Sequence, residues 1–403
     1  MSTSLLYHAF GVYGYVYQGT EYVGGEVFFT VEQPTSALKC SVCESDQVIR
    51  RGGRERRFRG LPIGKRAVWI ELKVPRLECK VCGAVRQAEV SFAPGQRSYT
   101  KRLARYIVEL ARHMTIQDVA EHLGVSWNLV KDLLKEALRK RFGRPRLKDL
   151  RLLAIDEISI GRGHRYLTVV MDLETGAVVF IGKGKGAKAL GPFWKRLKRA
   201  GVTIEAVAID MSQAYINAVR AHLPHATLVF DHFHVVKLMN DKLSDLRRAL
   251  QRQAEEQDKE VLKGMRWLLL KAPKNLDETR DEVERLEAAL SLNAPLATAY
   301  YLKEDLRQLW NQPDKERATS FLEDWIERAR ATGIRQLVQM SNTLSLHRAG
   351  ILAYYDVPIS TGPLEGTNNK IKTLQRQAYG YRDTEFFYLR IFALHQSRYE
   401  LVG

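Results

Sequence analysis

The chain has 403 residues, of which 45% are hydrophobic and 27% charged, a composition typical of folded globular domains that excludes a disordered chain. Its formal net charge of +17 at pH 7 indicates a polyanionic partner, with nucleic acid first and an anionic membrane surface second. No apolar run approaches the ~20 residues of a membrane span, and the N-terminus has no basic segment ahead of an unbroken apolar one, so we expect a cytoplasmic DNA- or RNA-binding protein.

Residues 1–36 alternate aromatic and polar side chains, as in "YGYVYQGTEYVGGEVFFTVE". Alternation with a period of two is typical of strands that have one face buried. We therefore expect a strand pair here, forming an N-terminal extension of the domain that follows.

The chain contains four cysteines, in two C-x-x-C pairs: Cys40 with Cys43, and Cys79 with Cys82. None is left over, which argues against a secreted disulfide framework. Two pairs flanking a strand-like run predict a structural zinc ribbon over residues 37–95, with Zn²⁺ held by the four thiolates. Buried or redox-active cysteines without metal are the alternative.

The stretch between the two pairs, "IRRGGRERRFRGLPIGKR", is dense in arginine and glycine. This composition predicts a loop laid along DNA phosphates, with Arg54, Arg56 and Arg57 as candidate contacts. A solvated loop that binds nothing is the alternative.

Residues 98–142 have the periodicity of helices and the signals of a tight turn between two of them. Thr115 is placed to cap one helix, Gly124 to form the turn, and Ser126 to cap the next. This pattern predicts a helix-turn-helix DNA-binding domain, whose second helix enters the major groove; an ordinary helical hairpin is the alternative. The candidate base-reading side chains are Ser126, Trp127, Asn128 and Lys131. The basic segment "RFGRPRLKD" then predicts a linker.

Between residues 148 and 240, three apolar strands joined by glycine-containing turns precede alternating helices and strands. The order β-β-β-α-β-α-β-α predicts a mixed sheet covered on both faces, which is the pattern of the ribonuclease H-like fold. The loop "GKGKGAK" does not fit a phosphate-binding loop, because no Gly-Lys-Ser/Thr follows at the required spacing. Its Lys183 and Lys185 remain candidate DNA contacts.

Residues 241–345 have leucines at helical spacing, many charges and no strand signal. They predict an all-helical insertion into the sheet domain, with solvated outer faces. Residues 346–403 then form the last part of the core. The predicted fold class is thus multidomain α/β: a zinc ribbon, a helix-turn-helix, and a mixed-sheet core interrupted by helices.

Several acids lie at the ends or in the middle of the predicted strands. Asp156 is inside the most apolar strand, where an ionised carboxylate is costly unless a cation or hydrogen bonds compensate it. Asp210 and Asp231 each end a strand, which is where ligands of open α/β sheets gather. Glu157 points to the face opposite Asp156, because successive strand residues alternate. Asp172 is more typical of a turn residue.

Glu365 is the one acid in "STGPLEGTNNKIKTLQRQ", where Pro363 predicts the first turn of a helix. The helical period places Glu365 on one stripe with Asn369, Lys372 and Arg376. An apolar stripe of Leu364, Ile371, Leu374 and Ala378 is expected to pack inward. A first-turn acid that complements the helix dipole is the alternative, with a contribution of ~0.3–1 kcal/mol.

Asp156, Asp210 and Glu365 are therefore candidate ligands for two hard divalent cations, which we expect to be Mg²⁺ or Mn²⁺. Two such ions about 3.5–4 Å apart activate a water or 3′-hydroxyl and stabilise the leaving oxygen of a phosphodiester. The basic residues around Glu365, together with Asn369, would hold the strand that is cut.

These residues lie within motifs that resemble the ISL3 family of insertion-sequence transposases, which have an Asp-Asp-Glu ribonuclease H-like core. The resemblance covers nearly the whole chain and includes the opening "LYHAFGV", the cysteine pairs, the helix-turn-helix, "AIDMSQAY", "LPHATLVFDHFHVVKLMN" and "LEGTNNKIKTLQRQAYGYR". It implies that the catalytic triad is Asp156, Asp210 and Glu365. It also implies that Asp231 and His234, in "DHFH", lie near the active site.

The resemblance further implies recognition of terminal inverted repeats, cleavage at the 3′ ends of the element, and joining of those ends to target DNA without a covalent enzyme intermediate. Pairing of two ends implies a homodimer or a larger synaptic assembly. Two alternatives stay open: a DNA-binding regulator with no catalytic activity, and a metal-dependent nuclease of the same fold that cuts without joining.

Overall fold

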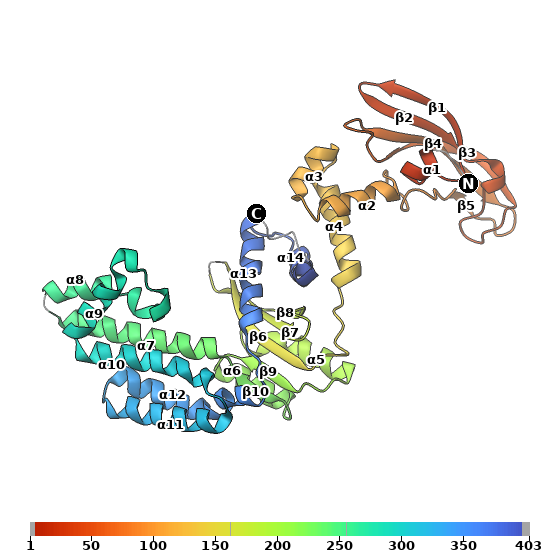
Figure 1. The fold of residues 1–403 in the computed structure, drawn as a ribbon. Helices are drawn as coiled ribbons and strands as arrows, with labels where there is room; N and C mark the ends of the chain where they lie inside the picture. The colour runs from red at the N-terminus through yellow and green to blue at the C-terminus, as the bar shows by residue number, and fades with distance from the viewer. Residues whose placement is uncertain (1–4, 162, 255, 397–403) are drawn as a thin grey trace. The chain divides into compact units, whose positions relative to one another are not determined.

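A computed structural model describes residues 5–161, 163–254 and 256–396, which divide into two compact units (Figure 1). One unit takes the residues up to Arg144, and the other spans Pro145–His395. Among the described residues, no helix combines the length and the apolar character that crossing a membrane requires.

The first unit begins with a sheet in the order β1-β2-β4-β3, with β5 paired to β4. The expected strand pair is present as the antiparallel hairpin β1–β2, and it belongs to the same sheet as β4, which ends in Cys79. A short helix that the alternation did not predict precedes it, with Leu6 and Phe10 buried against the sheet. The elements are α1 Leu5–Phe10, β1 Val16–Val23, β2 Glu26–Glu32, β3 Val48–Arg59, β4 Val68–Cys79 and β5 Val85–Gln87.

The arginine- and glycine-rich stretch between the cysteine pairs is mainly a strand, and its prediction as a loop was wrong. It forms most of β3, which pairs antiparallel with β4 along its length. The two glycines make a bulge in that strand rather than a loop, since the register shifts between Arg50 and Gly53. Gly52 has φ +81°, and a Cβ on Gly53 would lie 2.9 Å from the carbonyl oxygen of Val74.

Three helices complete the first unit, and the last two have the capping signals read from the sequence. Thr115 and Asp118 form a reciprocal capping box on α3, Gly124 ends that helix with φ +60°, and the Ser126 hydroxyl caps α4. Arg59 of β3 donates a hydrogen bond of 2.9 Å to the Leu123 carbonyl, which ties the sheet to this helix pair. The helices are α2 Lys101–Leu110, α3 Ile116–Leu123 and α4 Trp127–Phe142.

The second unit contains the predicted mixed sheet, in the order β10-β9-β6-β7-β8. Strands β6, β7 and β8 are joined as antiparallel hairpins, whereas β9 and β10 run parallel to β6. This is the arrangement expected of a ribonuclease H-like core, with β6 at its centre. The elements are β6 Leu152–Gly161, β7 Arg165–Asp172, β8 Val178–Lys183, α5 Gly191–Ala200, β9 Ala206–Ile209, α6 Gln213–His222 and β10 Thr227–Phe230.

An all-helical block follows β10, as predicted, and shares one continuous apolar core with the sheet. Trp325 is wholly buried at its centre and donates its indole N–H to the Leu302 carbonyl at 2.9 Å. The helices are α7 His232–Gln253, α8 Glu256–Gly264, α9 Glu282–Leu292, α10 Ala294–Leu306, α11 Lys315–Ala331 and α12 Arg335–Leu352. Short 3-10 helices occur at η1 Thr35–Ala37, η2 Ala187–Leu190, η3 Leu268–Leu270, η4 Pro273–Asn275, η5 Glu278–Arg280, η6 Arg307–Asn311, η7 Ala353–Tyr355 and η8 Leu394–Gln396.

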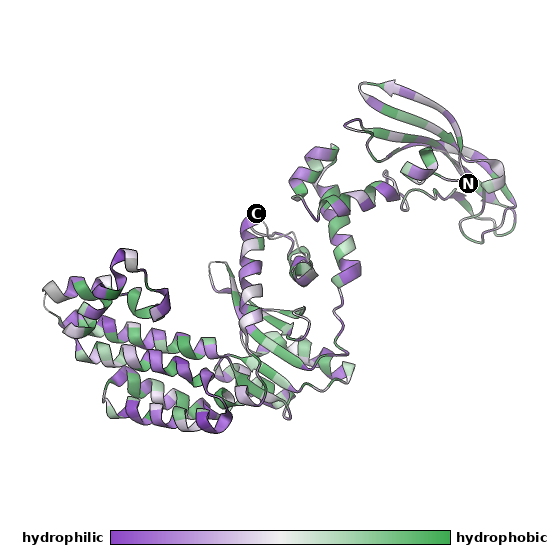
Figure 2. Ribbon diagram, in the orientation of Figure 1, coloured by the Kyte–Doolittle hydropathy of each residue, from purple (hydrophilic) through white to green (hydrophobic). Residues whose placement is uncertain are grey.

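The chain returns to the sheet through α13, Gly362–Gln377, and α14, Thr384–Ala393. Helix α13 packs on β6, and α14 packs on β8. Of the predicted inward stripe of α13, Leu364, Ile371 and Leu374 are buried, but Ala378 lies beyond the helix end and is exposed. Figure 2 shows apolar residues concentrated in the strands of the second unit's sheet, whereas its helices carry both apolar and polar residues.

Candidate functional site

Three aspartates lie in one row across the parallel strands of the second unit. The register pairs Ala154 of β6 with Ala208 of β9, so two residues further along Asp156 is level with Asp210. The pairing of β9 with β10 continues in the same way to Asp231, whose N–H donates to the Ile209 carbonyl at 3.1 Å. Residues in register on parallel strands point to the same face, so the row places three carboxylates on one side of the sheet.

Asp156 is the central member of this row and is held from both sides. Its Oδ1 accepts the N–H of Glu157 at 2.7 Å, and its Oδ2 accepts the side-chain amide of Asn368 at 2.8 Å. Burial raises the pKa of the Asp156 carboxyl, the amide of Glu157 and the nearby His234 oppose that rise, and the charge of Asp210 adds to it. A cation bound beside a carboxylate with a raised pKa stabilises its ionised form.

Asp210 and Asp231 follow their strands directly and differ in exposure. Asp210 is partly exposed, and its Oδ1 accepts the N–H of Ser212 at 3.0 Å in a short turn before α6. Asp231 is buried, with 1% of its surface exposed, and its Oδ1 accepts the N–H of Thr361 at 3.0 Å. Its Oδ2 is buried and has no hydrogen-bond partner among the described residues. His234 lies in the first turn of α7, which begins beside Asp231.

Glu365 lies in the first turn of α13 and is partly exposed. Its N–H donates to the Thr361 carbonyl at 2.8 Å. Residues three apart on a helix lie on the same side, and Asn368 on that side reaches Asp156, so α13 presents Glu365 toward the aspartate row. Among the described residues, however, these acids do not form a group whose ligand atoms all lie within 4.8 Å of one another.

The donor chemistry of the row fits a hard divalent cation. Asp156, Asp210 and Glu365 offer carboxylate oxygens, which Mg²⁺ and Mn²⁺ prefer over the thiolates and imidazoles that favour zinc. Burial and the charge of Asp210 both raise the pKa of Asp156, so a cation beside these two carboxylates would favour the ionised form of Asp156. Asp156, Asp210 and Glu365 are thus the residues that could hold such ions.

Glu157 faces the other side of the sheet, as the alternation predicts. Its Oε1 accepts the Tyr215 hydroxyl at 2.6 Å and the N–H of Gly186 at 2.9 Å. The same hydroxyl lies 3.1 Å from the hydroxyl of Thr168 on β7. Burial and then Glu157 raise the pKa of Tyr215, so the phenol stays a donor. This network holds β6 on the face opposite Asp156. It also anchors Gly186, in the loop that follows Lys183 and contains Lys185.

Two residues of this site were missed from the sequence. The amide that contacts Asp156 belongs to Asn368, whereas the sequence argument had placed Asn369 beside Glu365; Asn369 is exposed. Spacing by three as well as by four along the helix was the signal that could have found Asn368. Tyr215 had no such signal, since an aromatic residue in an amphipathic helix is ordinarily a core residue.

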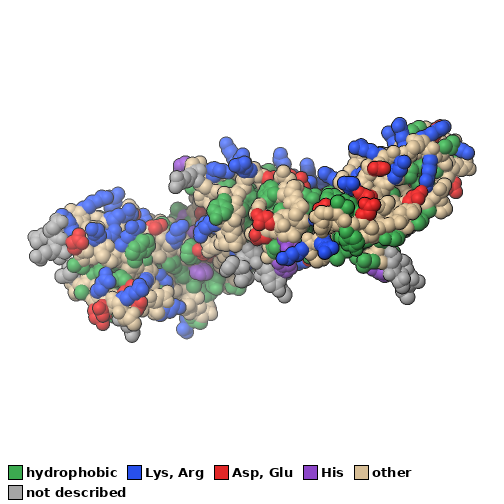
Figure 3. Space-filling model, turned by 90° about the horizontal axis from the view of Figure 1, so that it is seen from above, with side chains coloured by type: hydrophobic (Ala, Val, Ile, Leu, Met, Phe, Trp, Pro, Cys, Tyr) green, Lys and Arg blue, Asp and Glu red, His purple; other side chains and the backbone are tan. Residues whose placement is uncertain are grey.

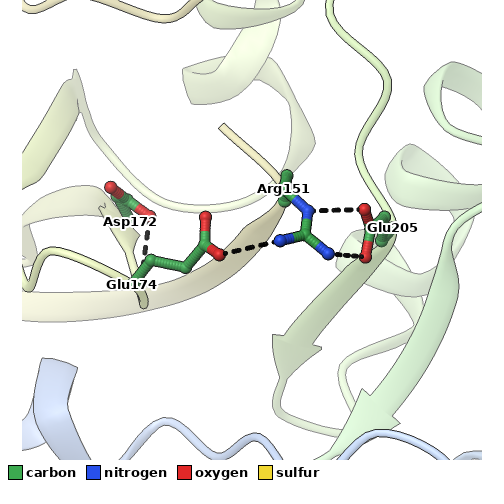
Figure 4. Close-up of polar contacts among 4 residues, drawn as sticks. All are labelled: Arg151, Asp172, Glu174 and Glu205. Atoms are coloured by element: carbon green, nitrogen blue, oxygen red, sulfur yellow. Dashed lines mark hydrogen bonds and ion pairs between the residues drawn. The ribbon is translucent and has the colours of Figure 1, made fainter. Parts of the chain in front are cut away.

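Asp172, expected in a turn, is instead the last residue of β7, where it pairs with Leu153 of β6 and accepts hydrogen bonds from the turn that follows. Its Oδ1 accepts the N–H of Glu174 at 3.1 Å, and its Oδ2 accepts the Thr175 hydroxyl at 2.5 Å. Next to it, Arg151 at the start of β6 bridges Glu174 and Glu205, as Figure 4 shows. These contacts connect the residue before β6 to the turn after β7 and to the residue before β9. They take no part in the candidate site.

The four cysteines form a compact cluster in the first unit. The Sγ atoms of Cys40 and Cys82 are 3.6 Å apart, those of Cys43 and Cys79 are 3.5 Å apart, and all four lie within 4.8 Å of one another. These distances are too long for disulfides, and they are close to the edge of about 3.8 Å of a tetrahedron with Zn–S bonds near 2.3 Å. The amides of Val42 and Val81 point at Cys40 and Cys79, each at 3.4 Å, as in a zinc knuckle.

The candidate base-reading residues lie at the start of α4. Trp127 is 45% exposed and Asn128 is exposed, so both are available to a groove. The Ser126 hydroxyl accepts the Leu129 N–H at 3.2 Å and is therefore used as the helix cap. Lys131 has 20% of its side chain exposed and an ion pair with Asp132 at 3.6 Å.

The arginines predicted to contact phosphate differ in their surroundings. Arg54 is exposed, whereas Arg56 donates to the carbonyls of Gln96 and Arg97, and Arg57 forms a 2.7 Å ion pair with Glu71. In the second unit, Lys183, Lys185, Lys372 and Arg376 are exposed. Figure 3 shows basic side chains spread over the visible face of each unit rather than collected in one patch.

Comparisons with known proteins agree along most of the chain. Residues 153–391 match a family model described as a transposase, residues 88–138 match the helix-turn-helix domain of transposase family ISL3, and residues 37–82 match the zinc-finger of transposase IS204/IS1001/IS1096/IS1165. The transposase for insertion sequence element IS1001 of Bordetella parapertussis is 37% identical over 340 residues, which cover 83% of this chain and 83% of that one.

More distant similarities are also found. The transposase for insertion sequence element IS1557 of Mycobacterium tuberculosis is 29% identical over 384 residues, covering 88% of this chain and 85% of the relative. Among solved structures, a chain of the Drosophila P element transposase strand transfer complex covers 76% of this chain and 94% of its own, with a TM-score of 0.42 and 13% identity.

Proposed function

Because the chain belongs to the ISL3 family of insertion-sequence transposases, we propose that it binds the terminal inverted repeats of its element, cuts the 3′ ends and joins them to target DNA. The observation that carries this proposal is the Asp156–Asn368 hydrogen bond of 2.8 Å. It joins the central strand, with its aspartate row, to the helix that bears Glu365. The helix-turn-helix supports DNA binding, and the comparisons support a DNA transposition enzyme.

We assign catalysis to Asp156, Asp210 and Glu365. Two Mg²⁺ or Mn²⁺ ions held by these acids would activate the attacking water or 3′-hydroxyl and stabilise the leaving oxygen of the phosphodiester. Asn368 and the Glu157 amide each occupy one oxygen of Asp156 and so orient its carboxylate. The N-terminal end of α13 lies at the same place and offers positive potential to a DNA phosphate.

The first unit is assigned to recognition of the DNA ends. Trp127 and Asn128 at the exposed start of α4 are placed to contact base edges in the major groove. The cysteine cluster holds structural Zn²⁺ and fixes the sheet whose Arg54 contacts a phosphate. In the second unit, exposed Lys183, Lys185, Lys372 and Arg376, with Asn369, hold the strand to be cut. Pairing of two ends requires at least a homodimer.

The test is a strand-transfer assay on labelled element ends with a supercoiled target, comparing wild type, Asp156→Asn, Asp210→Asn and Glu365→Gln in Mg²⁺ or EDTA. We expect metal-dependent 3′-end cleavage and joined product from the wild type, and at least about a thousandfold loss in each variant, with end binding retained. Each substitution keeps the size of the side chain and removes its charge.

Two other outcomes identify the rival functions. Cleavage without joining would identify a metal-dependent nuclease. Binding with no strand breakage in any metal would identify a regulator and remove the catalytic assignment.

A further inference from the structure

We propose that Asp231 is a positioning residue that fixes the place of Glu365 by holding the start of α13, and that charge on Asp231 is not what the reaction needs. The proposal rests on the function assigned above and concerns the same site. Nothing in the comparisons gives Asp231 a role.

A direct relay of two hydrogen bonds connects Asp231 to Glu365. The Asp231 Oδ1 accepts the N–H of Thr361 at 3.0 Å, and the Thr361 carbonyl accepts the N–H of Glu365 at 2.8 Å. Thr361 is 2% exposed, so no water competes for its N–H, and a buried bond to a charged acceptor is both strong and costly to lose. The backbone of one residue therefore fixes the first turn of α13 relative to the end of β10.

This hydrogen bond also connects the two ends of the helical insertion. Asp231 is the last residue before α7, and Thr361 is the last before α13, so the bond joins the points where the insertion leaves the sheet and returns to it. The last insertion helix is seated beside the same point. A Cβ on Gly350 would lie 2.5 Å from the ring of Phe230, and the rings of Phe230 and His347 are 5.2 Å apart. The insertion and the first turn of α13 are thereby held as one body.

Exposure separates Asp231 from the residues assigned to the cations. Asp156, Asp210 and Glu365 are each partly exposed, as a group that meets metal ions and DNA must be. The side chain of Asp231 is 0% exposed, and one of its oxygens is already taken by the Thr361 N–H. A metal ligand at Asp231 would depend on its negative charge, whereas a positioning residue needs an oxygen that accepts one hydrogen bond.

Asparagine keeps that acceptor and removes the charge, so Asp231→Asn and Asp231→Ala in the full chain separate the two roles. We expect Asp231→Asn to transfer strands at a rate within about tenfold of wild type. We expect Asp231→Ala to lose about a hundredfold or more, and to require a higher Mg²⁺ concentration for half-maximal rate, because Glu365 is no longer held in place. Affinity for the element ends should stay unchanged in both.

Asp172→Ala is the matched control, since it removes another buried aspartate that accepts local hydrogen bonds, far from the row. It should lower the melting temperature while leaving the Mg²⁺ dependence as in the wild type. A merely structural role for Asp231 would give the same result as this control and would overturn the proposal. The proposal would also be overturned if Asp231→Asn were as inactive as Asp156→Asn, because that result would make Asp231 a metal ligand.

Hydrogen exchange tests the relay without using activity, in the metal-free and DNA-free protein. The amides of Thr361 and Glu365 should exchange at least about tenfold faster in Asp231→Ala than in wild type, and at the wild-type rate in Asp231→Asn. Equal exchange in all three proteins would contradict the relay. If exchange follows this expectation but neither the wild type nor the variants transfer strands, the assigned function is wrong, whereas the hydrogen-bonded connection from Asp231 to Glu365 is still supported.

Discussion

At the scale of single residues, the site gathers acids in a place where a folded protein would otherwise avoid them. Asp156 has its pKa raised by burial and by Asp210, and the Oδ2 of Asp231 is buried without a partner among the described residues. Each feature is costly to the fold, and cations bound between Asp156 and Asp210 would offset the first of them. The cost at Asp156 is what the proposed cation site on the central strand β6 would explain.

Tyr379 is a second residue whose conformation is unfavourable by itself. It ends α13 in a Schellman motif, with the Gly380 N–H bonded to the Gln375 carbonyl at 2.9 Å and the Tyr379 N–H to the Arg376 carbonyl at 3.1 Å. Its φ of +50° is in the left-handed region, which favours glycine, and its side chain is 100% exposed.

Tyr379→Gly should therefore raise the free energy of unfolding by about 0.5–1 kcal/mol, because the left-handed strain is removed and no packing is lost. Urea unfolding followed by circular dichroism measures this change. Tyr379→Ala is the control, since it removes the same ring and keeps the strain, and it should leave stability near that of the wild type. A glycine variant no more stable than the alanine one would contradict the argument.

The residues of the site that lie in or directly after a strand were predictable from the sequence. Those on helices that pack against the sheet were less predictable. Asp156 and Asp210 stand out because an acid inside or directly after an apolar strand has few structural uses. Asn368 does not stand out, because its neighbour Asn369 fits a helical stripe equally well and only the docking of α13 on β6 decides between them. The partner of Glu157, Tyr215, depends on the packing of α6 and has no local signature.

At the scale of elements, the cysteine pairs and β3–β5 form one structure that we expect to depend on metal. The cluster lies at the end of β4, which carries Cys79 and pairs with β3 and with β5. Without a cation, four thiolates in this cluster would repel one another, so metal loss should loosen this end of the sheet.

We expect about one Zn²⁺ per purified chain, and its removal by a chelator should lower the melting temperature of the first unit and abolish binding to the element ends. Atomic emission, thermal melts and gel shifts measure the three quantities. Cys43→Ser should reproduce the loss in part, because one ligand is gone and the others remain. Unchanged melting and binding after complete zinc removal would show that the cluster does not stabilise the sheet.

The helical insertion contains a pH-sensitive contact of its own. Glu282, in the first turn of α9, accepts Lys271 Nζ at 2.5 Å and the N–H of Asp277 at 2.8 Å. The bond from Lys271 and then that from Asp277 hold the pKa of Glu282 below its ordinary value of 4.5. A depressed carboxylate pKa contributes stability that is present above pH 4.5 and is lost as the pH falls through the lower value of the folded state.

Glu282→Gln should therefore be less stable than wild type at pH 7 and should lose less stability as the pH falls below 4.5. Thermal melts of both proteins between about pH 7 and 3 measure this. Glu284→Gln, on the exposed side of the same helix, is the matched control and should follow the wild-type curve. Parallel curves for wild type and Glu282→Gln would remove this contact from the pH response.

Elements with strong local signals were predicted well, and those set by pairing were not. The capped helices α3 and α4 and the hairpins of β6, β7 and β8 follow from caps, turns and apolar periodicity. Strand β3 was mistaken for a loop because its arginines and glycines are typical of loops, yet pairing with β4 and a bulge at Gly52 accommodate them. In β3, pairing with a neighbouring strand therefore determined the backbone conformation more strongly than the local amino-acid composition did.

At the scale of the whole molecule, the matched helix-turn-helix and the matched transposase domain lie in different compact units. The sheet of the first unit has a core of its own around Phe58 and Ile70, whereas the second unit shares one core between its sheet and the helical insertion. The boundary falls at Arg144 and Pro145, inside the segment predicted to be a linker. Each core can thus form without burying surface of the other unit.

A fragment of residues 145–403 should therefore fold, because its apolar core is complete, and it should still bind DNA through exposed lysines such as Lys183 and Lys372. It should bind element ends no more tightly than random DNA, whereas the full chain should prefer them by about a thousandfold or more. Circular dichroism and gel shifts at several salt concentrations measure this. The fragment's binding should fall with salt equally on both DNAs, since phosphate contacts carry no sequence information. A fragment that still selects the ends would move end recognition from the helix-turn-helix to the mixed-sheet unit.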